Sequence, residues 1–570
     1  MTRLNMRRTL EMAAILMLLL AVIPRVYAQL SAPPSPNTQS PPAVAPGPQA
    51  PDNTQILLPS VVLKVPDISA ATVNPILPKG QTLTIPDAGV PLPDTGALHV
   101  PDQAFNVPLP GRQPSATVSA GGTSLYNTGV IGVGSTNHIV GSLSLYKLGV
   151  APQLRLHFLH EGLDGFAGKP AGTGYFTTSN VLSGALSTGD SRLGTDSQAS
   201  FQDEAFGLQD QSSAYYSVGV RTMNGSMGLS YKPSQLLSFG VRIEADAASR
   251  LYTVSGPAPT GNPAIWAYTV APSLSAGLSI PNLDLQLHGL YNLRLTDGLP
   301  AMNTANLGLF ADATLPAEFL LKANVGAFWT IGTGFLYPFS IDLAKSFGSN
   351  LSFNLSGGFS VTPQSFTDLW TRYPLLHVGN SVSGSLANST AWFGSAGFSL
   401  STQDLQFTTL GSVMLSYREQ VVDITGYDSA SSSYLYQQNN YLTLQPQVRV
   451  TWSPVTLFSL SAGVQGNLLQ KAAQEPLVSA DLNVSASGPR DRFGGGITGR
   501  FNIFDVPEIP NLSATMFVRL TDGVELDLDA ADLLSPLIPA GRPVMGAVRN
   551  ANFPFYAPGF RVTLSTHISL

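Results

Sequence analysis

The sequence predicts an all-β protein: a large closed antiparallel transmembrane β-barrel of about 18 to 20 strands, an even number, preceded by a proline-rich extended arm. Three observations favour this fold. Residues 116–570 form a long series of segments in which apolar and polar residues alternate. Only 11% of the residues are charged, yet the mean hydropathy is just +0.14. Beyond the N-terminus, no apolar run approaches the roughly 20 residues that a membrane-spanning helix requires.

Residues 282–295 show the alternation most clearly. Their odd-numbered positions are apolar or glycine, and their even-numbered positions are mostly polar. Because successive side chains of a strand point to opposite faces, one face is apolar and the other is polar. Many such strands suit a barrel that has lipid outside and a polar lumen inside. The apolar face comprises Leu283, Leu285, Leu287, Gly289, Tyr291, Leu293 and Leu295.

The same pattern recurs along residues 351–361, 442–452, 478–486 and 512–520. At about 3.3 Å per residue, residues 442–452 extend about 33 Å. Tilted by about 45°, they rise roughly 23 Å, near the apolar band of about 25 Å in membrane barrels. Pro446 interrupts that strand unless it lies at a bulge. Long strands, low charge and the absence of a fixed repeat period disfavour a soluble β-sandwich or β-solenoid.

Turn residues separate the predicted strands. Short turns are expected at Pro281-Asn282, Leu315-Pro316, residues 348–350 and Ser453-Pro454. Long polar connections are expected over residues 161–211, 363–388, 418–440 and 522–554. Short turns on one side of the membrane and long loops on the other are typical of outer-membrane barrels.

Residues 1–28 are predicted to be a signal peptide. Three arginines precede an apolar stretch at residues 12–23, and Val26-Tyr27-Ala28 is a small-x-small cleavage sequence. Cleavage is therefore expected between Ala28 and Gln29. The alternative is an uncleaved anchor helix, which is disfavoured because the apolar stretch is shorter than the roughly 20 residues of a membrane span.

Residues 29–115 are predicted to be a proline-rich arm on the periplasmic side, and residues 116–570 the barrel. Residues 31–114 hold 19 of the 44 prolines, which remove backbone donors and interrupt both helices and central strands. The arm is either a spacer or a segment that docks on a periplasmic protein or in the barrel mouth. A spaced pattern marks its second part, at Val65-Pro66-Asp67, Ile85-Pro86-Asp87, Leu92-Pro93-Asp94 and Val100-Pro101-Asp102.

No motif indicates an enzyme or a cofactor site. The chain has no cysteine, so disulfides and thiolate ligands are excluded. Residues 494–499 have the glycine spacing of a dinucleotide fingerprint, but a strand-like segment follows them instead of a helix. Gly189-Asp190-Ser191 has no downstream Asp-x-x-His partner, and His157 and His160 lie on opposite faces of a strand. The net charge of −6, without basic runs, gives no nucleic-acid footprint.

Charged residues on the polar face are the candidate functional residues. Each lies opposite the apolar face of its strand, so we expect it to face the lumen. Charges that line a lumen set the local potential and the preference for a class of solute. The alternative is that they hydrate the interior or pair with one another. The candidates are Asp284, His288, Arg294, Asp342, Arg449, Arg519 and Arg561.

The last predicted strand resembles a feature of known barrels. After Gly559 the chain alternates between an apolar and a polar face up to its end. This resembles the closing strand that bacterial outer-membrane barrels present to their assembly machinery. The resemblance implies residence in the bacterial outer membrane, with membrane lipid and the barrel-assembly machinery as partners. The apolar face comprises Phe560, Val562, Leu564, Ile568 and Leu570.

Residues 512–570 also resemble the tail of a TonB-dependent receptor barrel. The resemblance rests on Val518-Arg519-Leu520, a long last loop and Tyr556-Ala557-Pro558-Gly559. Asp52-Asn53-Thr54-Gln55-Ile56 is similar to the energy-coupling box of that family. Such receptors carry a plug domain inside the barrel, for which residues 29–115 are too short and too rich in proline. The resemblance therefore implies a relative without a plug.

These features predict a channel or transporter that passes solutes across the outer membrane. One alternative is a plug-less barrel, like that of TonB-dependent receptors, that works with a periplasmic partner. The other is a surface-exposed structural or adhesive barrel, in which the long loops act and the lumen is shut. A barrel of about 18 to 20 strands is wide enough for an aqueous lumen, which the arm or an inward-folded loop could partly fill.

Overall fold

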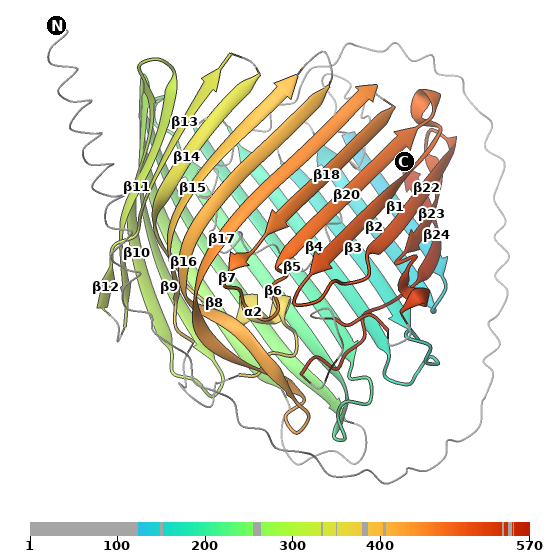
Figure 1. The fold of residues 1–570 in the computed structure, drawn as a ribbon. Coiled ribbons are helices and arrows are strands. Elements are labelled where there is room, and N and C mark those ends of the chain that lie inside the picture. The colour runs from blue at the N-terminus through green and yellow to red at the C-terminus, as the bar shows by residue number, and fades with distance from the viewer. Residues whose placement is uncertain are drawn as a thin grey trace, which may run out of the picture. The chain divides into compact units, whose positions relative to one another are not determined.

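The computed structural model is a closed barrel of 22 antiparallel strands (Figure 1). Strands adjacent in the wall are also consecutive in the sequence. The barrel closes where β1 (Ser124–Gly134) pairs with β24 (Arg561–Ser569). The structure describes residues 124–148, 152–190, 192–254, 264–331, 334–348, 350–378, 386–402, 406–455, 457–538, 541–544, 550 and 552–569.

The first half of the wall continues with β2 (His138–Leu148), β3 (Gln153–Asp164), β4 (Phe176–Gly189), β5 (Leu193–Gly207), β6 (Tyr215–Tyr231), β7 (Leu237–Val254), β8 (Ile265–Ile280), β9 (Leu283–Thr296), β10 (Met302–Leu315) and β11 (Phe319–Thr330). The second half contains β13 (Phe339–Phe347), β14 (Leu351–Thr362), β15 (Ser389–Thr402), β16 (Phe407–Asp428), β17 (Ser433–Val455), β18 (Phe458–Gly466), β20 (Val478–Ser487), β21 (Phe493–Ile503), β22 (Asn511–Thr521) and β23 (Val524–Ala531). Two short strands pair beside the wall, β12 (Gly334–Leu336) with β11 and β19 (Leu468–Leu469) with β17. The helical elements of the described part are α2 (Phe366–Arg372), η3 (Pro489–Asp491) and η4 (Ser535–Leu537).

The strand number is even, as predicted, but it exceeds the expected 18 to 20. β4 and β5 lie within residues 161–211, and β23 lies within residues 522–554, all of which the sequence predicts to be polar connections. β16 and β17 likewise continue through most of residues 418–440. The outer faces of the missed strands explain the error, because few apolar residues mark them. In β5 that face carries Thr195, Ser197, Ala199, Phe201 and Asp203.

The two ends of the barrel differ in their connections. One end, here called the turn end, has short turns such as residues 281–282, 316–318 and 348–350. The opposite end, the loop end, has the connections of residues 363–388 and 532–560. Because the strand number is even and each pair is antiparallel, the first strand begins and the last strand ends at the turn end. The predicted turn at Ser453-Pro454 is wrong, since β17 continues to Val455.

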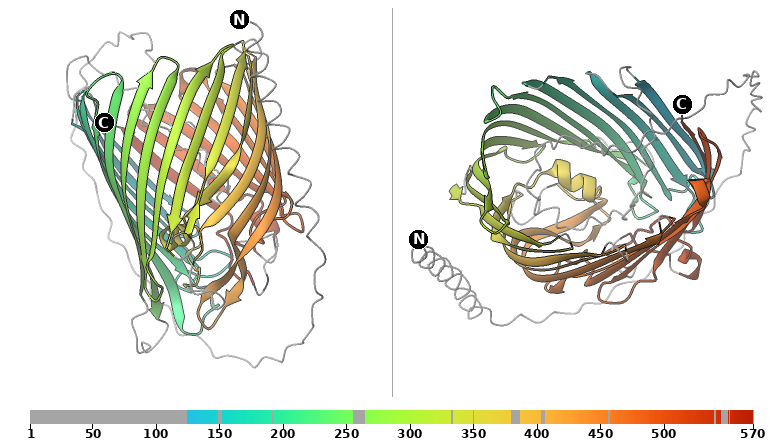
Figure 2. Two further views of the ribbon diagram at one scale, coloured as in Figure 1. Left: turned by 90° about the vertical axis from the view of Figure 1, so that its left-hand side faces the viewer. Right: turned by 90° about the horizontal axis from the view of Figure 1, so that it is seen from above.

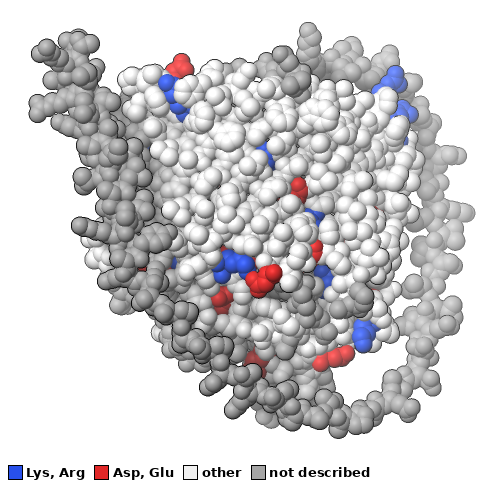
Figure 3. Space-filling model, in the orientation of Figure 1, with Lys and Arg blue, Asp and Glu red and all other residues white. Residues whose placement is uncertain are grey.

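The register gives each strand an outer and an inner face. Leu285 of β9 lies opposite Leu278 of β8 and Ala311 of β10, whereas Gln286 lies opposite Gly277 and Phe310. The face of Leu285 belongs to a band of exposed apolar residues around the wall. Much of the barrel surface in Figure 3 carries no charged side chain. Such a surface fits the apolar interior of a membrane.

Aromatic residues mark both edges of the apolar band. Phe407 of β16 and Trp452 of β17 are register partners towards the turn end. Trp392 of β15 and Tyr417 of β16 are partners towards the loop end. The ten residue steps from Phe407 to Tyr417 cover about 33 Å of strand, or a rise of roughly 23 Å at a tilt of about 45°. Aromatic girdles near this spacing are typical of outer-membrane barrels.

Pro446 lies inside β17 without a bulge at its position. It faces outward opposite Val413 of β16. The pairing of β17 with β18 begins at the next residue, Gln447. The missing backbone donor of Pro446 therefore falls where this ladder ends, which is a position that tolerates proline.

The predicted signal peptide, its cleavage site between Ala28 and Gln29, and the proline-rich arm lie outside the described residues. The last residue, Leu570, lies outside them too. Within the described ranges, no helix has both the length and the apolar character needed to cross a membrane.

Candidate functional site

Part of the lumen at the loop end is filled by connections that fold inward. We call them the inner cap. It comprises residues 363–378 and 386–388 between β14 and β15, residues 419–440 at the far end of the β16–β17 hairpin, and residues 541–544 and 552–557 between β23 and β24. Figure 2 shows α2 inside the ring of strands. The sequence predicts that a loop could fill the lumen, but not which one.

Helix α2 forms because its sequence provides an N-terminal cap and an apolar side. Ser365 is extended at the N-cap position, and its hydroxyl accepts a hydrogen bond from the Asp368 amide at 3.2 Å. Phe366, Leu369 and Trp370 are buried, and these spacings place them on one side of the helix. The helix therefore presents an apolar side that has to be covered by other parts of the protein.

The apolar side of α2 belongs to a core that the inner cap shares with the wall. Val218, Val220, Ala248 and Ala267 contribute to it from β6, β7 and β8. These small, inward-facing side chains leave room for the rings of the cap. Burial of apolar area, at about 25 cal/mol per Å², stabilises the docked position. The members from the cap are Phe366, Leu369, Trp370, Leu375, Leu376, Leu386, Val422, Ile424, Tyr434, Tyr436 and Phe555.

Arg250 of β7 holds the chain that follows α2. Its guanidinium donates to the Leu376 carbonyl oxygen, which also accepts a hydrogen bond from Trp370 Nε1 at 3.1 Å. The guanidinium lies over the rings of Tyr252 and Trp370, at 5.3 and 5.6 Å from their centroids. Arg250 is only 2% exposed, and no carboxylate of the described residues forms an ion pair with it. Two ring faces and one carbonyl therefore offset only part of its cost of burial.

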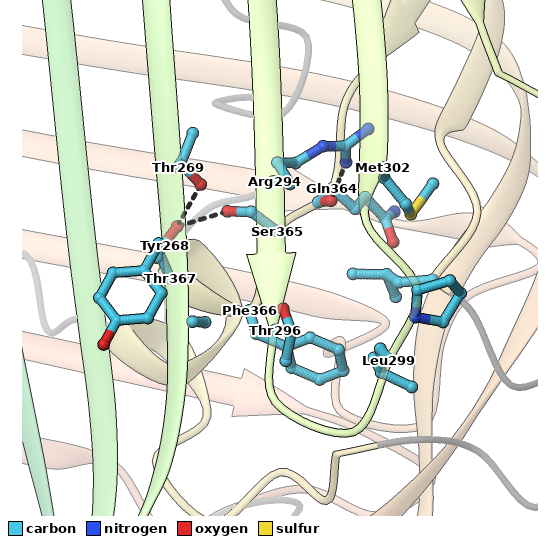
Figure 4. A pocket seen from close by; sticks show the side chains of 13 residues that line it. Tyr268, Thr269, Arg294, Thr296, Leu299, Met302, Gln364, Ser365, Phe366 and Thr367 are labelled. Carbon is cyan, nitrogen blue, oxygen red and sulfur yellow. Dashed lines mark hydrogen bonds between the residues drawn. The ribbon is translucent and has the colours of Figure 1, made fainter.

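Arg294 of β9 holds the chain that precedes α2 (Figure 4). Its guanidinium donates to the Gln364 carbonyl oxygen and, at 2.9 Å, to Asn388 Oδ1. Beside it, the hydroxyls of Thr269 and Thr367 are 3.4 Å apart and join β8 to α2. Arg294 is 5% exposed and, within the described part, has no carboxylate in an ion pair. The two ends of the α2 segment are thus each fixed by a buried arginine of the wall.

The β16–β17 hairpin reaches across the mouth to the opposite side of the wall. At its tip, Ser433 Oγ lies 2.9 Å from the Tyr252 hydroxyl, and the Ser432 hydroxyl donates to Ser212 Oγ at 2.6 Å. Tyr434 also exchanges backbone hydrogen bonds with the α2 segment, donating to Leu375 O and accepting from the amide of His377. The hairpin and the α2 segment therefore support each other.

The β23–β24 connection is fixed by Arg542. Its guanidinium binds both oxygens of Asp532 and one of Glu508, each at 2.8 Å. Burial by itself lowers the pKa of Arg542, but hydrogen bonds and charge from Asp532 and Glu508 raise it above its ordinary value. Farther along, the backbone of Tyr556 exchanges two hydrogen bonds with the Gln209 side chain. This part of the inner cap is held by paired charges, unlike the α2 segment.

A cavity of about 400 Å³ remains between the inner cap and the rest of the wall. Its wall side comes from β4, β5, β17, β18, β20 and β21, and its cap side from the end of α2 and the residues before β24. The lining mixes aromatic rings, side-chain amides and charges. This cavity is the candidate functional site, because it lies inside the barrel, has both polar and apolar lining residues, and is large enough for a small molecule. The lining includes Phe176, Phe206, Arg372, Tyr373, Gln445, Gln465, Asn467, Gln474, Glu475, Arg500 and Phe555.

The register places the predicted lumen-facing residues on the inner faces of their strands, where their neighbours differ from one residue to the next. Asp284 lies opposite Asp312, and Asp342 lies opposite Lys322, whose ammonium is 3.8 Å from Asp312. His288 is half-buried, with its ring centroid 6.5 Å from that of Phe310. None of these residues lines the cavity.

The four predicted arginines also lie apart from the cavity lining. Arg294 is covered by the inner cap. Arg449 forms an ion pair with Asp481 at 3.3 Å, Arg519 with Glu525 at 2.8 Å, and Arg561 with Glu161 at 3.8 Å. Pairing with neighbours is the alternative that the sequence left open. Their effect on solutes stays a prediction.

Sequence reasoning missed Arg250, Arg372 and Arg500. Arg250 and Arg500 share the inner face of their strands with other polar residues, so the alternation contained a signal for them. Arg372 had none, because it lies in a connection that the sequence predicts to be a loop. Nothing in the local pattern indicates which polar residues a folded connection will cover.

Comparisons with known proteins relate the chain to outer-membrane receptors through fold alone. No protein-family model and no curated protein sequence matches the chain. A mutant of the ferric enterobactin receptor PfeA from Pseudomonas aeruginosa matches with a TM-score of 0.58 and 11% identity, over 79% of this chain and 81% of that chain. The copper transporter OprC matches with a TM-score of 0.58 and 12% identity, over 79% and 80%. The FrpB iron transporter from Neisseria meningitidis (F3-3 variant) has a TM-score of 0.58 and 9% identity, over 79% and 82%. These neighbours are TonB-dependent receptors with 22-strand barrels.

Proposed function

We propose that this protein is a transporter of the bacterial outer membrane that moves a small solute through its barrel. The apolar band with aromatic edges supports a membrane location. The turn end then faces the periplasm, because short turns lie on that side in such barrels. The observation that carries the proposal is the cavity of about 400 Å³ between the inner cap and the wall of a closed 22-strand barrel.

In this proposal, the α2 segment leaves its docked position during transport. The segment crosses the lumen at the loop end and is fixed at both ends, by Arg250 and Arg294. Both guanidiniums are buried and donate only to neutral oxygens of the segment. Their desolvation therefore offsets much of what these contacts contribute. On undocking, both regain water. The docked and undocked positions therefore differ in free energy by less than the buried apolar area alone implies.

A disulfide across this contact tests the proposal. The chain has no cysteine, so Thr269→Cys with Thr367→Cys introduces the only pair, at positions whose hydroxyls are 3.4 Å apart. Oxidation locks α2 to β8. We expect conductance in planar bilayers, or solute uptake by proteoliposomes, to fall on oxidation and to return on reduction.

A second pair provides the matched control. Ser356→Cys with Ser395→Cys joins β14 to β15 within the wall, where the hydroxyls are 2.5 Å apart, and leaves the inner cap free. Its oxidation should leave flux unchanged. Equal flux through the oxidised and reduced cap pair would show that the α2 segment does not control the path. If the folded barrel shows no flux in either the oxidised or the reduced form of both pairs, the surface-structural alternative is favoured.

The fold neighbours favour a second candidate, transport that depends on a periplasmic partner. In this version the arm of residues 29–115 contacts a periplasmic protein, and the barrel-assembly machinery inserts the barrel through β24. Deleting residues 30–110 with the signal peptide retained should leave a folded barrel. The same deletion should abolish flux in cells, yet not in bilayers, if a partner acts through the arm. Normal flux in cells after the deletion would contradict this version.

A further inference from the structure

Two arginines line the cavity, one from each side, and neither has a partner among the described residues. Arg372 lies in the last turn of α2, in the inner cap, and Arg500 lies on the inner face of β21 in the wall. Neither guanidinium forms an ion pair or a hydrogen bond with the residues that the structure describes. Their positions differ from those of Arg250 and Arg294, which are buried and hold the cap itself.

Glu475 of the cavity lining and Asp481, which is opposite Arg500, both have other partners. Glu475 lines the cavity, but both of its oxygens bind the Arg418 guanidinium, at 2.9 and 3.0 Å. Asp481 is the register partner of Arg500, yet its carboxylate is paired with Arg449 at 3.3 Å. The cavity therefore keeps an excess of positive charge. An anionic group entering it finds two guanidiniums that no carboxylate of the described residues occupies.

The rest of the lining favours a flat or apolar body. Phe176, Phe206 and Phe555 supply ring faces and edges. Between them lie side-chain amides, including Gln465 and Asn467, which donate and accept hydrogen bonds without adding charge. The volume of about 400 Å³ holds more than an inorganic anion.

We infer that this cavity binds a small organic anion with an aromatic or apolar body, such as an aromatic carboxylate or sulfonate. Arg372 and Arg500 bind the anionic groups from opposite sides, and the phenylalanine rings contact the body. A guanidinium suits this task because its planar donors match the oxygens of a carboxylate or sulfonate. The inference rests on the proposed function only in taking the lumen as the path of the solute, since binding can be measured without transport.

Equilibrium dialysis of the full chain in lipid nanodiscs tests the site. The probe is naphthalene-2-sulfonate, and 2-naphthylmethylammonium provides a probe of similar shape and opposite charge. We expect the sulfonate to bind and the ammonium not to. Arg372→Gln and Arg500→Gln should each weaken sulfonate binding roughly tenfold, as expected for a lost charge-assisted hydrogen bond. Arg500→Lys, which keeps the charge, should recover part of the affinity.

Arg519→Gln is the matched control, because Arg519 is inward-facing, lies outside the cavity lining and is paired with Glu525. It should leave sulfonate binding unchanged. Equal binding of both probes would overturn the inference in favour of a purely apolar pocket. An equal loss in Arg519→Gln would overturn it in favour of a diffuse potential. Heat-modifiability of each variant shows whether the barrel has folded. Sulfonate binding without flux would contradict the transport proposal alone.

Discussion

The wall and the inner cap are folded from one chain by opposite means. In the wall, side chains alternate along each strand between the lipid and the lumen. Backbone hydrogen-bond ladders connect consecutive strands. In the inner cap, aromatic residues are buried inside the barrel, and the contacts join distant parts of the sequence, such as Arg250 with Leu376 and Gln209 with Tyr556. The fold of the wall therefore depends on many equivalent residues, whereas the docked position of the inner cap depends on a few specific residues.

Two tryptophans give the largest expected contrast. Trp370 of the inner cap is 0% exposed, and Trp392 of the wall is 52% exposed towards lipid. Trp370→Ala removes the centre of the shared core and should cost about 3–5 kcal/mol of docking free energy. Hydrogen exchange should then show loss of protection in α2 while the wall stays protected. Trp392→Ala should leave α2 protected. Protection of α2 in both variants would show that the cap does not depend on its core.

In the wall, the effect of a substitution on barrel assembly should depend more on whether the residue lies on the outer or the inner face than on the size of the new side chain. Leu287 of β9 is exposed on the outer face, and Gln286 is the neighbouring inner-face residue. Leu287→Arg places a charge in lipid and should cost about 2–4 kcal/mol if it lies near the midplane. Gln286→Arg places the same side chain in the lumen and should be tolerated. Membrane-fraction and heat-modifiability assays compare them, and equal behaviour would contradict the assignment of faces.

The difference between the two regions also explains how far the sequence could predict the structure. The faces of β9 follow from a period of two, so the all-β class and the orientation of Leu285 and Gln286 could be predicted. β5 was missed because its outer face carries Thr195 and Ser197, which give no apolar signal. The cap was predicted only as an unspecified loop, because burial of Trp370 depends on Ala248 and Ala267, which are far from it in the sequence.

Arg250 should have an effect of the opposite sign to that of Trp370. Its guanidinium is buried without a carboxylate, and its desolvation should outweigh the contribution of about 2 kcal/mol from the two ring faces. Arg250→Leu leaves the Leu376 carbonyl with its hydrogen bond from Trp370. We expect the docked cap to gain about 1–2 kcal/mol. Hydrogen exchange in α2 should become slower and flux should fall; faster exchange would show that Arg250 stabilises the docked cap.

The smallest effect on stability should come from the paired arginines of the lumen, and it should be visible in ion selectivity. Arg449 and Arg519 are partly exposed and paired with Asp481 and Glu525, so Arg449→Gln with Arg519→Gln should change stability by no more than about 1 kcal/mol per pair. Each substitution removes one positive charge and leaves a carboxylate on the inner face. The reversal potential in a KCl gradient should therefore shift towards cation preference. Arg221→Gln is the control for each of the two substitutions made singly, because it also removes one positive charge and Arg221 pairs with Asp203 on the outer face. A shift of the same size in Arg221→Gln would mean that net charge, and not the lumen wall, sets the selectivity.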